Sequence, residues 1–166
     1  MIAAPLPSDD AQRLQALREL LILDTPPEER FDRVVRFAAE EFDMPIVLVS
    51  LVDAKRQWFK ARVGLDACET GRDISFCGHV VVQTEVMVVP DALLDERFFD
   101  NPLVTGAPNL RFYAGAPLQL PAGQIVGTLC LIDRVPRRLD AVDEAILGSL
   151  RDLVASELVA QAVVSG

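Results

Sequence analysis

The sequence lacks the features that would place it in a membrane or in an oxidising compartment. No hydrophobic run reaches the roughly 18 residues that a membrane-spanning helix needs. Residues 1–10 contain no basic segment followed by a long apolar one, so we expect no secretory signal. The three cysteines form no CxxC pair, and their odd number argues against a disulfide framework. We therefore expect a soluble, cytoplasmic protein with reduced cysteines.

Common signatures of catalysis and of polyanion binding are also missing. The chain has no Gly-rich phosphate loop, no GxSxG and no HExxH motif, and no pair of acidic residues marks a general acid and base. A zinc site is disfavoured because a single residue separates Cys77 from His79, the one histidine. The net charge of −9 opposes binding to nucleic acids or to anionic membranes. We therefore expect no catalytic residues, no metal, no nucleic acid and no membrane partner.

The composition and the hydrophobic pattern of the sequence indicate one α+β domain. The 166 residues, 51% of them hydrophobic, suffice for a single core. Apolar residues at helical spacing predict a helix from Ser8 or Asp9 and a last helix from Asp140. A second helix has Thr25 as its N-cap and Pro26 at its first position. Apolar or alternating segments predict strands at 46–52, 57–63, 85–89, 111–120 and 124–133. Few helices separate these strands, so an antiparallel sheet with its helices on one face fits best.

Two stretches fit no regular element, and both ends are expected to be loose. Residues 64–75 are polar, and residues 90–109 contain three prolines. Loops of this length inside a compact domain are usually functional lids or binding segments. Apolar residues within 90–109 favour an ordered lid. We expect a flexible tail at 1–8, a single domain over 9–160 and a frayed C-terminus at 161–166.

Five segments, in this order along the chain, together resemble a GAF domain, the small-molecule-sensing module of bacterial signalling proteins. They are LRELLILDTPPEERF at 17–31, VLVSLVDAKRQWFKARVG at 47–64, DISFCGHVV at 73–81, VVPDALLDERFFDNPLV at 88–104 and RFYAGAPLQLPAGQIVGTLCLID at 111–133. The sequence is most similar to the subgroup that precedes histidine kinase or diguanylate cyclase modules. The resemblance implies a six-stranded antiparallel sheet, with the N- and C-terminal helices among those on one face. It also implies a ligand pocket under the loops of the other face. No kinase or cyclase segment follows, so we expect a free-standing GAF protein or a separate output protein such as a kinase or diguanylate cyclase.

Candidate ligand-binding residues lie in the 75–79 segment and around the long loop. Ser75, next to Phe76, is placed to cap a short helix that runs through Val80 to Gln83 and has Cys77 and His79 near its N-terminus. Backbone N–H groups there favour an anion and lower a thiol pKa. We favour Cys77 as a small buried residue, whereas His79 is equally a pocket contact or an internal hydrogen-bonding group. The other candidates are Asp91, Asp95, Arg97, Asn101, Arg111 and Tyr113. An Asp–Arg pair on a loop is more often a salt bridge that orders a lid than a ligand site.

Within the family that the sequence resembles, these residues narrow the function. Phytochrome-type GAF domains attach a bilin through a cysteine followed directly by histidine, whereas here Gly78 intervenes. Free methionine sulfoxide reductases place a Cys-Gly pair near the position of Cys77 but need further cysteines, which residues 90–109 lack. Cys68 is the one cysteine available as a resolving thiol before the motif. The Asp-Glu-Arg-Phe segment at 95–98 differs from the Asn-Lys-Phe-Asp-Glu signature of cyclic-nucleotide GAF domains.

These observations favour a non-catalytic sensory domain that binds a small molecule and transmits a signal through its terminal helices. The alternatives are a methionine sulfoxide reductase-like thiol enzyme that uses Cys77, and a purely structural dimerisation domain. The ligand and any cofactor stay unknown. Apolar residues beyond those needed for a core stripe predict a homodimer through the first and last helices. They are Leu14, Leu17, Leu20, Leu21, Ile22, Leu147, Leu158, Val159, Val163 and Val164.

Overall fold

A computed structural model describes the backbone of residues 1–165 and the side chains of residues 1–160. The elements in chain order are α1 (Asp10–Glu19), α2 (Glu29–Glu41), β1 (Ile46–Val52), β2 (Arg56–Val63), β3 (Glu69–Gly71), α3 (Cys77–Val80), β4 (Met87–Val89), the 3₁₀ helix η1 (Ala92–Leu94), α4 (Pro102–Thr105), β5 (Phe112–Gln119), β6 (Ile125–Asp133) and α5 (Ala141–Ser165). None of the described helices combines the length and the apolar character needed to cross a bilayer.

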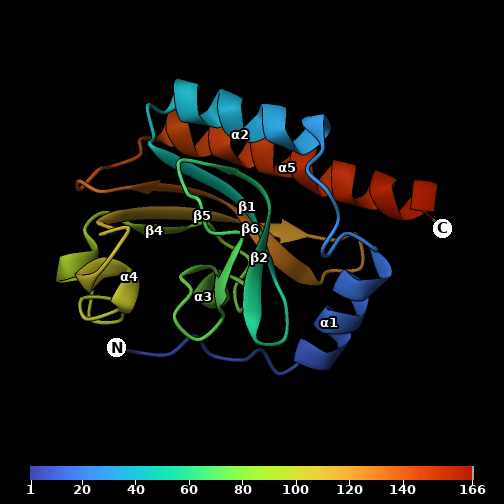
Figure 1. Ribbon diagram of the computed structural model, residues 1–166, viewed down its shortest axis with the longest axis horizontal. Coiled ribbons are helices and arrows are strands. Elements are labelled where there is room, and N and C mark those ends of the chain that lie inside the picture. Colours follow the sequence, from blue (N-terminus) through green and yellow to red (C-terminus); the bar gives the residue numbers. More distant parts are fainter. Residues whose placement is uncertain (166) are drawn as a thin grey trace.

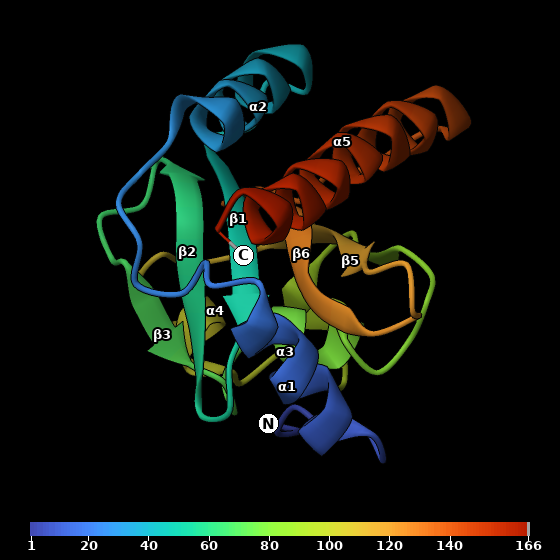
Figure 2. The same ribbon diagram turned by 90° about the vertical axis from the view of Figure 1, so that its right-hand side faces the viewer.

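The molecule has three layers, with one antiparallel sheet in the middle (Figure 1). The six strands lie in the order β3-β2-β1-β6-β5-β4, and each neighbouring pair is antiparallel. Helices α2 and α5 cover one face, which we call the helix face, and α1 lies at the end of the sheet near β6 (Figure 2). The short helices and long connections cover the opposite face, which we call the loop face. The predicted α+β fold with a six-stranded antiparallel sheet is confirmed.

Two local predictions from the sequence are wrong. Helix α2 starts at Glu29 rather than next to Thr25, because the Thr25 hydroxyl donates to the Ile22 carbonyl at 2.5 Å and accepts from Lys60 at 2.7 Å. That hydroxyl is therefore not available to cap a helix. The polar stretch at 64–75 was expected to be irregular, yet it contains edge strand β3, which pairs with β2. The start of α5 agrees with prediction, since Asp140 accepts from the Asp143 amide at 2.8 Å.

The helix-face core contains most of the apolar residues from which a dimer through the terminal helices was predicted. Leu17 lies within α1, and Leu20 and Ile22 follow it; all three pack with residues of α2, α5 and the sheet. Leu147 and Leu158 of α5 are buried in the same core. Leu21 is exposed, and the side chains of Val163 and Val164 lie outside the described part of the chain. The surplus of apolar surface on these two helices is thus much smaller than the sequence suggested.

The lid over the loop face is held by its own caps and by the N-terminal segment. Asp91 accepts from the Leu93 amide and caps η1, and Asn101 accepts from the Leu103 amide and caps α4. Residues 1–8 run along this layer towards α1 (Figure 1). The Ile2 amide donates to the Arg97 carbonyl of the lid, and the Ala4 amide donates to the Asp73 carbonyl, before α3. The flexibility of this tail, the domain limits at 9 and 160 and the fray at 161–166 stay predictions.

Candidate functional site

The central strands present polar residues on the loop face of the sheet, beneath the lid. Ser50 of β1 pairs with Thr128 of β6, and Leu48 pairs with Cys130. Because alternate residues of a strand face the same side, Ser50, Thr128 and Cys130 all point towards the loops. The rest of this face is apolar, with Leu48 and other buried residues forming a second core. Polar groups on a fully buried face need partners, and Thr128 and Cys130 find theirs in one cluster.

Cys77 is the centre of this cluster. Its Sγ lies 3.1 Å from the Tyr113 hydroxyl, and the Thr128 hydroxyl donates to it at 3.1 Å. The Sγ of Cys130 is 3.9 Å away. All four side chains are buried. We call Cys77, Tyr113, Thr128 and Cys130 the thiol cluster.

The electrostatics of the cluster favour a negative charge on Cys77. Burial raises the pKa of this thiol, but hydrogen bonds from the surrounding side chains outweigh burial and lower the pKa to about 7. The pKa of Cys130 is raised well above its ordinary value by burial and by its contact with Cys77. Burial and the two neighbouring thiols likewise raise the pKa of Tyr113. The tyrosine and Cys130 therefore hold their protons more firmly than Cys77 does.

A line of hydrogen bonds continues from the cluster region towards the edge of the sheet. The Ser50 hydroxyl donates to Gln57 Oε1 at 3.1 Å, and the Gln57 amide in turn donates to Thr70 of β3. Sequence reasoning missed Ser50, Gln57, Thr128 and Cys130. A signal was present in β6, where Thr128 and Cys130 stand two positions apart on either side of Leu129 and therefore share a face. What the pattern does not give is which strand lies next to which.

Aromatic side chains close the cluster from the lid side. The ring of Phe76 stacks on Phe98 with centroids 3.9 Å apart, and it lies 5.2 Å from the Tyr113 ring. His79 meets the Phe98 ring edge-on at 4.8 Å. The pKa of His79 is lowered, mainly by burial and further by the charge of Arg97. His79 is thus a neutral, buried imidazole at the boundary between α3 and the lid.

The structure brings only some of the predicted residues together. Phe76, Cys77, His79 and Tyr113 meet under the lid, as described above. The remaining candidates hold the loops: Ser75 accepts from the Gly78 amide, Asp91 and Asn101 are caps, Arg111 donates to the carbonyls of Val104 and Leu110, and Arg97 pairs with Asp95. The Asp95–Arg97 pair, 2.8 Å apart, is the lid salt bridge that the sequence favoured.

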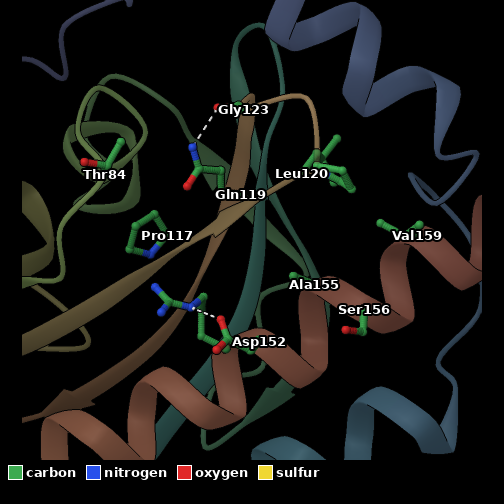
Figure 3. Close-up of a pocket in the computed structure, with 11 residues that line it drawn as sticks. Thr84, Pro117, Gln119, Leu120, Gly123, Asp152, Ala155, Ser156 and Val159 are labelled. Carbon is green, nitrogen blue, oxygen red and sulfur yellow. Dashed lines mark hydrogen bonds and ion pairs between the residues drawn. The ribbon is translucent and has the colours of Figure 1, made fainter.

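An open cleft lies elsewhere, between α5 and the β5–β6 hairpin (Figure 3). It has a volume of about 730 Å³, and none of the predicted site residues lines it. Among its polar side chains, Arg151 donates to Asp152 at 2.8 Å and Gln119 donates to the Gly123 carbonyl at 3.2 Å. Pro117, beyond the part of β5 that pairs with β4, leaves this edge without an amide for an added strand. The described residues that line the cleft include no cysteine, histidine or tyrosine.

Within the part of the chain whose side chains are described, no three histidine, cysteine or acidic residues converge as a metal site would require. The chemistry of the loop face is instead that of one thiol with a lowered pKa, the two hydroxyls beside it and a neutral imidazole. Such a set can bind a polar group by hydrogen bonds or act as a nucleophile.

Comparisons with known proteins agree with this architecture. The family model described as GAF domain matches residues 26–158. Over 137 residues the chain is 44% identical to a cyclic di-GMP phosphodiesterase of Pseudomonas aeruginosa, covering 82% of this chain but only 23% of that protein. The GAF domain of a phosphoenolpyruvate-protein phosphotransferase from Coxiella burnetii has a TM-score of 0.69 at 20% identity, covering 96% and 99% of the two chains. A type II free methionine-R-sulfoxide reductase from Thermoplasma acidophilum has a TM-score of 0.65 at 17% identity, covering 78% and 89%. At these identities the two structural likenesses show the fold alone.

Proposed function

Because the chain belongs to the GAF domain family, we propose that it is a sensory domain that binds a small molecule on the loop face of its sheet. One observation carries this proposal: a buried cluster of polar and thiol groups lies under a lid of short helices. Packing alone does not need these groups, and apolar residues would fill the same space without hydrogen-bond partners. The polar group of a ligand can replace the present hydrogen-bond partner of Tyr113 or of His79.

Ligand entry requires the lid to move, which suggests how a signal leaves the site. The stacked rings of Phe76 and Phe98 occupy the space next to Tyr113, so a ligand has to displace them. The segment that carries Phe76 is tied to α1, because Arg72 pairs with Asp10 of that helix at 2.7 Å. A shift of this segment therefore pulls directly on the N-terminal helix.

The proposed output follows from the relative with the higher identity. Since that protein is a cyclic di-GMP phosphodiesterase, we propose that this domain regulates an output module acting on cyclic di-GMP in the cytoplasm. A histidine kinase is the alternative output. The test is phosphodiesterase or cyclase activity of a candidate output protein with and without the domain. An unchanged rate at saturating domain would contradict this assignment.

We also propose a homodimer, formed through α5 and α2 rather than through α1. Phe37 of α2 is 50% exposed and Val142 of α5 is 66% exposed, and both line one apolar groove with Ile146 and Leu150. Pairing these grooves across a two-fold axis removes them from water.

A thiol enzyme is the second candidate function, because the lowered pKa of Cys77 favours a nucleophile. Its partner thiol is then not Cys68, which is exposed while Cys77 is buried. Turnover of free methionine sulfoxide with a thiol reductant tests this candidate. Activity that disappears in Cys77→Ser but persists in Cys68→Ser would support it, whereas no turnover would exclude it.

A further inference from the structure

Two of the three cysteines lie side by side in the loop-face core. The sulfurs of Cys77 and Cys130 are 3.9 Å apart, although 53 positions separate the two residues in the sequence. Both are buried and reduced in the structure, whereas Cys68 is exposed. A disulfide has an S–S distance of about 2.05 Å, so the two sulfurs need to approach by roughly 2 Å.

We propose that Cys77 and Cys130 form a reversible redox pair, which a hydroperoxide oxidises to an intramolecular disulfide that fastens α3 to β6. The two residues have unequal places in the fold. Cys130 is fixed in β6, between β1 and β5, where it pairs with Leu48 and Gly115. Cys77 begins α3, a helix of four residues. A small movement of α3 therefore brings Cys77 to Cys130 without disturbing the sheet.

The chemistry balances with hydrogen peroxide as the oxidant. The Cys77 thiolate attacks one peroxide oxygen, so that an S–O bond forms, the O–O bond breaks and hydroxide leaves and takes up a proton as water. Cys77 is then a sulfenic acid. The Cys130 sulfur attacks the Cys77 sulfur, the S–S bond forms, the S–O bond breaks and the departing hydroxide takes the Cys130 proton as a second water. Two thiols lose two electrons and two protons in total, and a dithiol reductant reverses the change.

The surroundings of the two sulfurs fit these roles. The hydroxyls of Tyr113 and Thr128 both lie 3.1 Å from the Cys77 sulfur, where they stabilise its thiolate, the form that attacks peroxide. Part of the rise in the Cys130 pKa comes from the charge of Cys77, and this part disappears once Cys77 is a neutral sulfenic acid. Cys130 then passes its proton to the departing hydroxide, and its sulfur is the nucleophile. The sequential order, Cys77 first and Cys130 second, follows from the unequal pKa values of the two thiols.

Access to the pair is controlled by α3 and the N-terminal segment that lies against it. Neither sulfur is open to solvent, and Ala4 of the N-terminal segment lies against Gly78, so that a Cβ placed on Gly78 would come within 2.6 Å of the Ala4 Cβ. Peroxide therefore reaches Cys77 only when α3 and this segment separate. Oxidation then closes a covalent loop between α3 and β6, which restricts the lid movement on which ligand entry depends.

The experiment uses the full chain with Cys68→Ser, which removes the exposed thiol and leaves two. The protein is treated with hydrogen peroxide, denatured in an alkylating reagent and examined by intact mass and peptide mapping. We expect the number of alkylated thiols to fall from two to zero, a peptide pair linked through Cys77 and Cys130, and full recovery of both thiols with dithiothreitol. The same linked peptides are expected from the unsubstituted chain, so the result does not depend on the variant.

Two further variants separate this pair from independent oxidation of each cysteine. In Cys68→Ser with Cys130→Ser, Cys77 is expected to stop at sulfenic acid and to form an adduct with dimedone. In Cys68→Ser with Cys77→Ser, Cys130 is expected to stay a free thiol. The proposal is overturned if both thiols stay free at peroxide concentrations that fully oxidise Cys68 in the unsubstituted chain. It is equally overturned if Cys77 gains oxygen while Cys130 remains alkylated.

Discussion

The hydroxyl of Tyr113 lies over Gly115, two residues further along strand β5. A Cβ built on Gly115 would come within 2.4 Å of this hydroxyl and within 2.8 Å of the ring carbon that carries it. The absence of a side chain at Gly115 is what lets the phenol lie flat along the strand and reach the Cys77 sulfur at 3.1 Å. One small residue thus positions the main hydroxyl of the thiol cluster.

Gly115→Ala is therefore expected to destabilise the protein. The added methyl group has to push the Tyr113 ring out of a well-packed core, which typically costs about 1–3 kcal/mol. Gly148→Ala in α5 is the matched control, since its new Cβ would meet only Arg151 at 3.5 Å and alanine favours a helix by about 1 kcal/mol. Urea unfolding of the two variants measures both effects. Equal stabilities would show that Tyr113 is not held against Gly115.

Tyr113→Phe is expected to raise the pKa of Cys77 above its value of about 7. The substitution removes a hydrogen bond to the thiolate while the ring keeps its packing. The ultraviolet absorbance of the thiolate, followed against pH in a Cys68→Ser background, measures the shift. Thr105→Val removes a hydroxyl outside the cluster and should leave the titration unchanged. A titration midpoint that is the same in Tyr113→Phe would mean that the tyrosine does not donate to Cys77.

Stability should fall as the pH drops through about 6.5, the ordinary pKa of histidine. Burial and Arg97 lower the pKa of His79, so the unfolded chain takes up a proton there that the folded protein does not. Below this pH the proton favours the unfolded state. His79→Gln, which cannot titrate, should make the thermal midpoint depend less on pH between about pH 7 and about pH 5.5. An unchanged slope in this variant would assign the effect to another group.

The dimer proposal predicts a mass of twice 18.2 kDa by light scattering. Phe37→Glu together with Val142→Glu should yield monomers, because each introduces a charge into the apolar groove. Leu21→Glu places the same charge at the end of α1, where the side chain is 56% exposed, and should leave the dimer intact. Dissociation by Leu21→Glu alone would favour the interface through α1 instead.

The parts of the fold set by local patterns were predictable from the sequence. The apolar stripe of α2 and the cap at Asp140 specify helices through interactions within a few residues. The start of α2 was not predictable, because the Thr25 hydroxyl accepts a hydrogen bond from Lys60, 35 positions away. A local capping motif cannot show a partner on a distant strand.

In the candidate site, too, residues with an unusual local motif were predictable from the sequence, whereas residues defined by tertiary contacts were not. Cys77 and His79 stand out because they form an unusual motif, and Tyr113 because it is the one tyrosine. Cys130 looks like an ordinary strand residue until β6 is placed beneath α3, and Thr128 likewise gains its role only from the register of β1 and β6. Asp91 and Asn101 look like ligand contacts, yet the side chains of both cap short helices. Tertiary pairing, rather than residue type, decides between these roles.

The loop face is the proposed ligand site, and native mass spectrometry tests this proposal most directly. The protein is mixed at millimolar concentration with each of a panel of cyclic mononucleotides, cyclic di-GMP, nucleoside triphosphates and free methionine sulfoxide. Tyr113→Leu alters the loop face, and Ser156→Phe fills the cleft between α5 and the β5–β6 hairpin as the control. We predict that one compound adds its mass to the unsubstituted protein and to Ser156→Phe but not to Tyr113→Leu. An adduct that survives Tyr113→Leu and disappears in Ser156→Phe, or no adduct with any compound, would contradict the loop-face site.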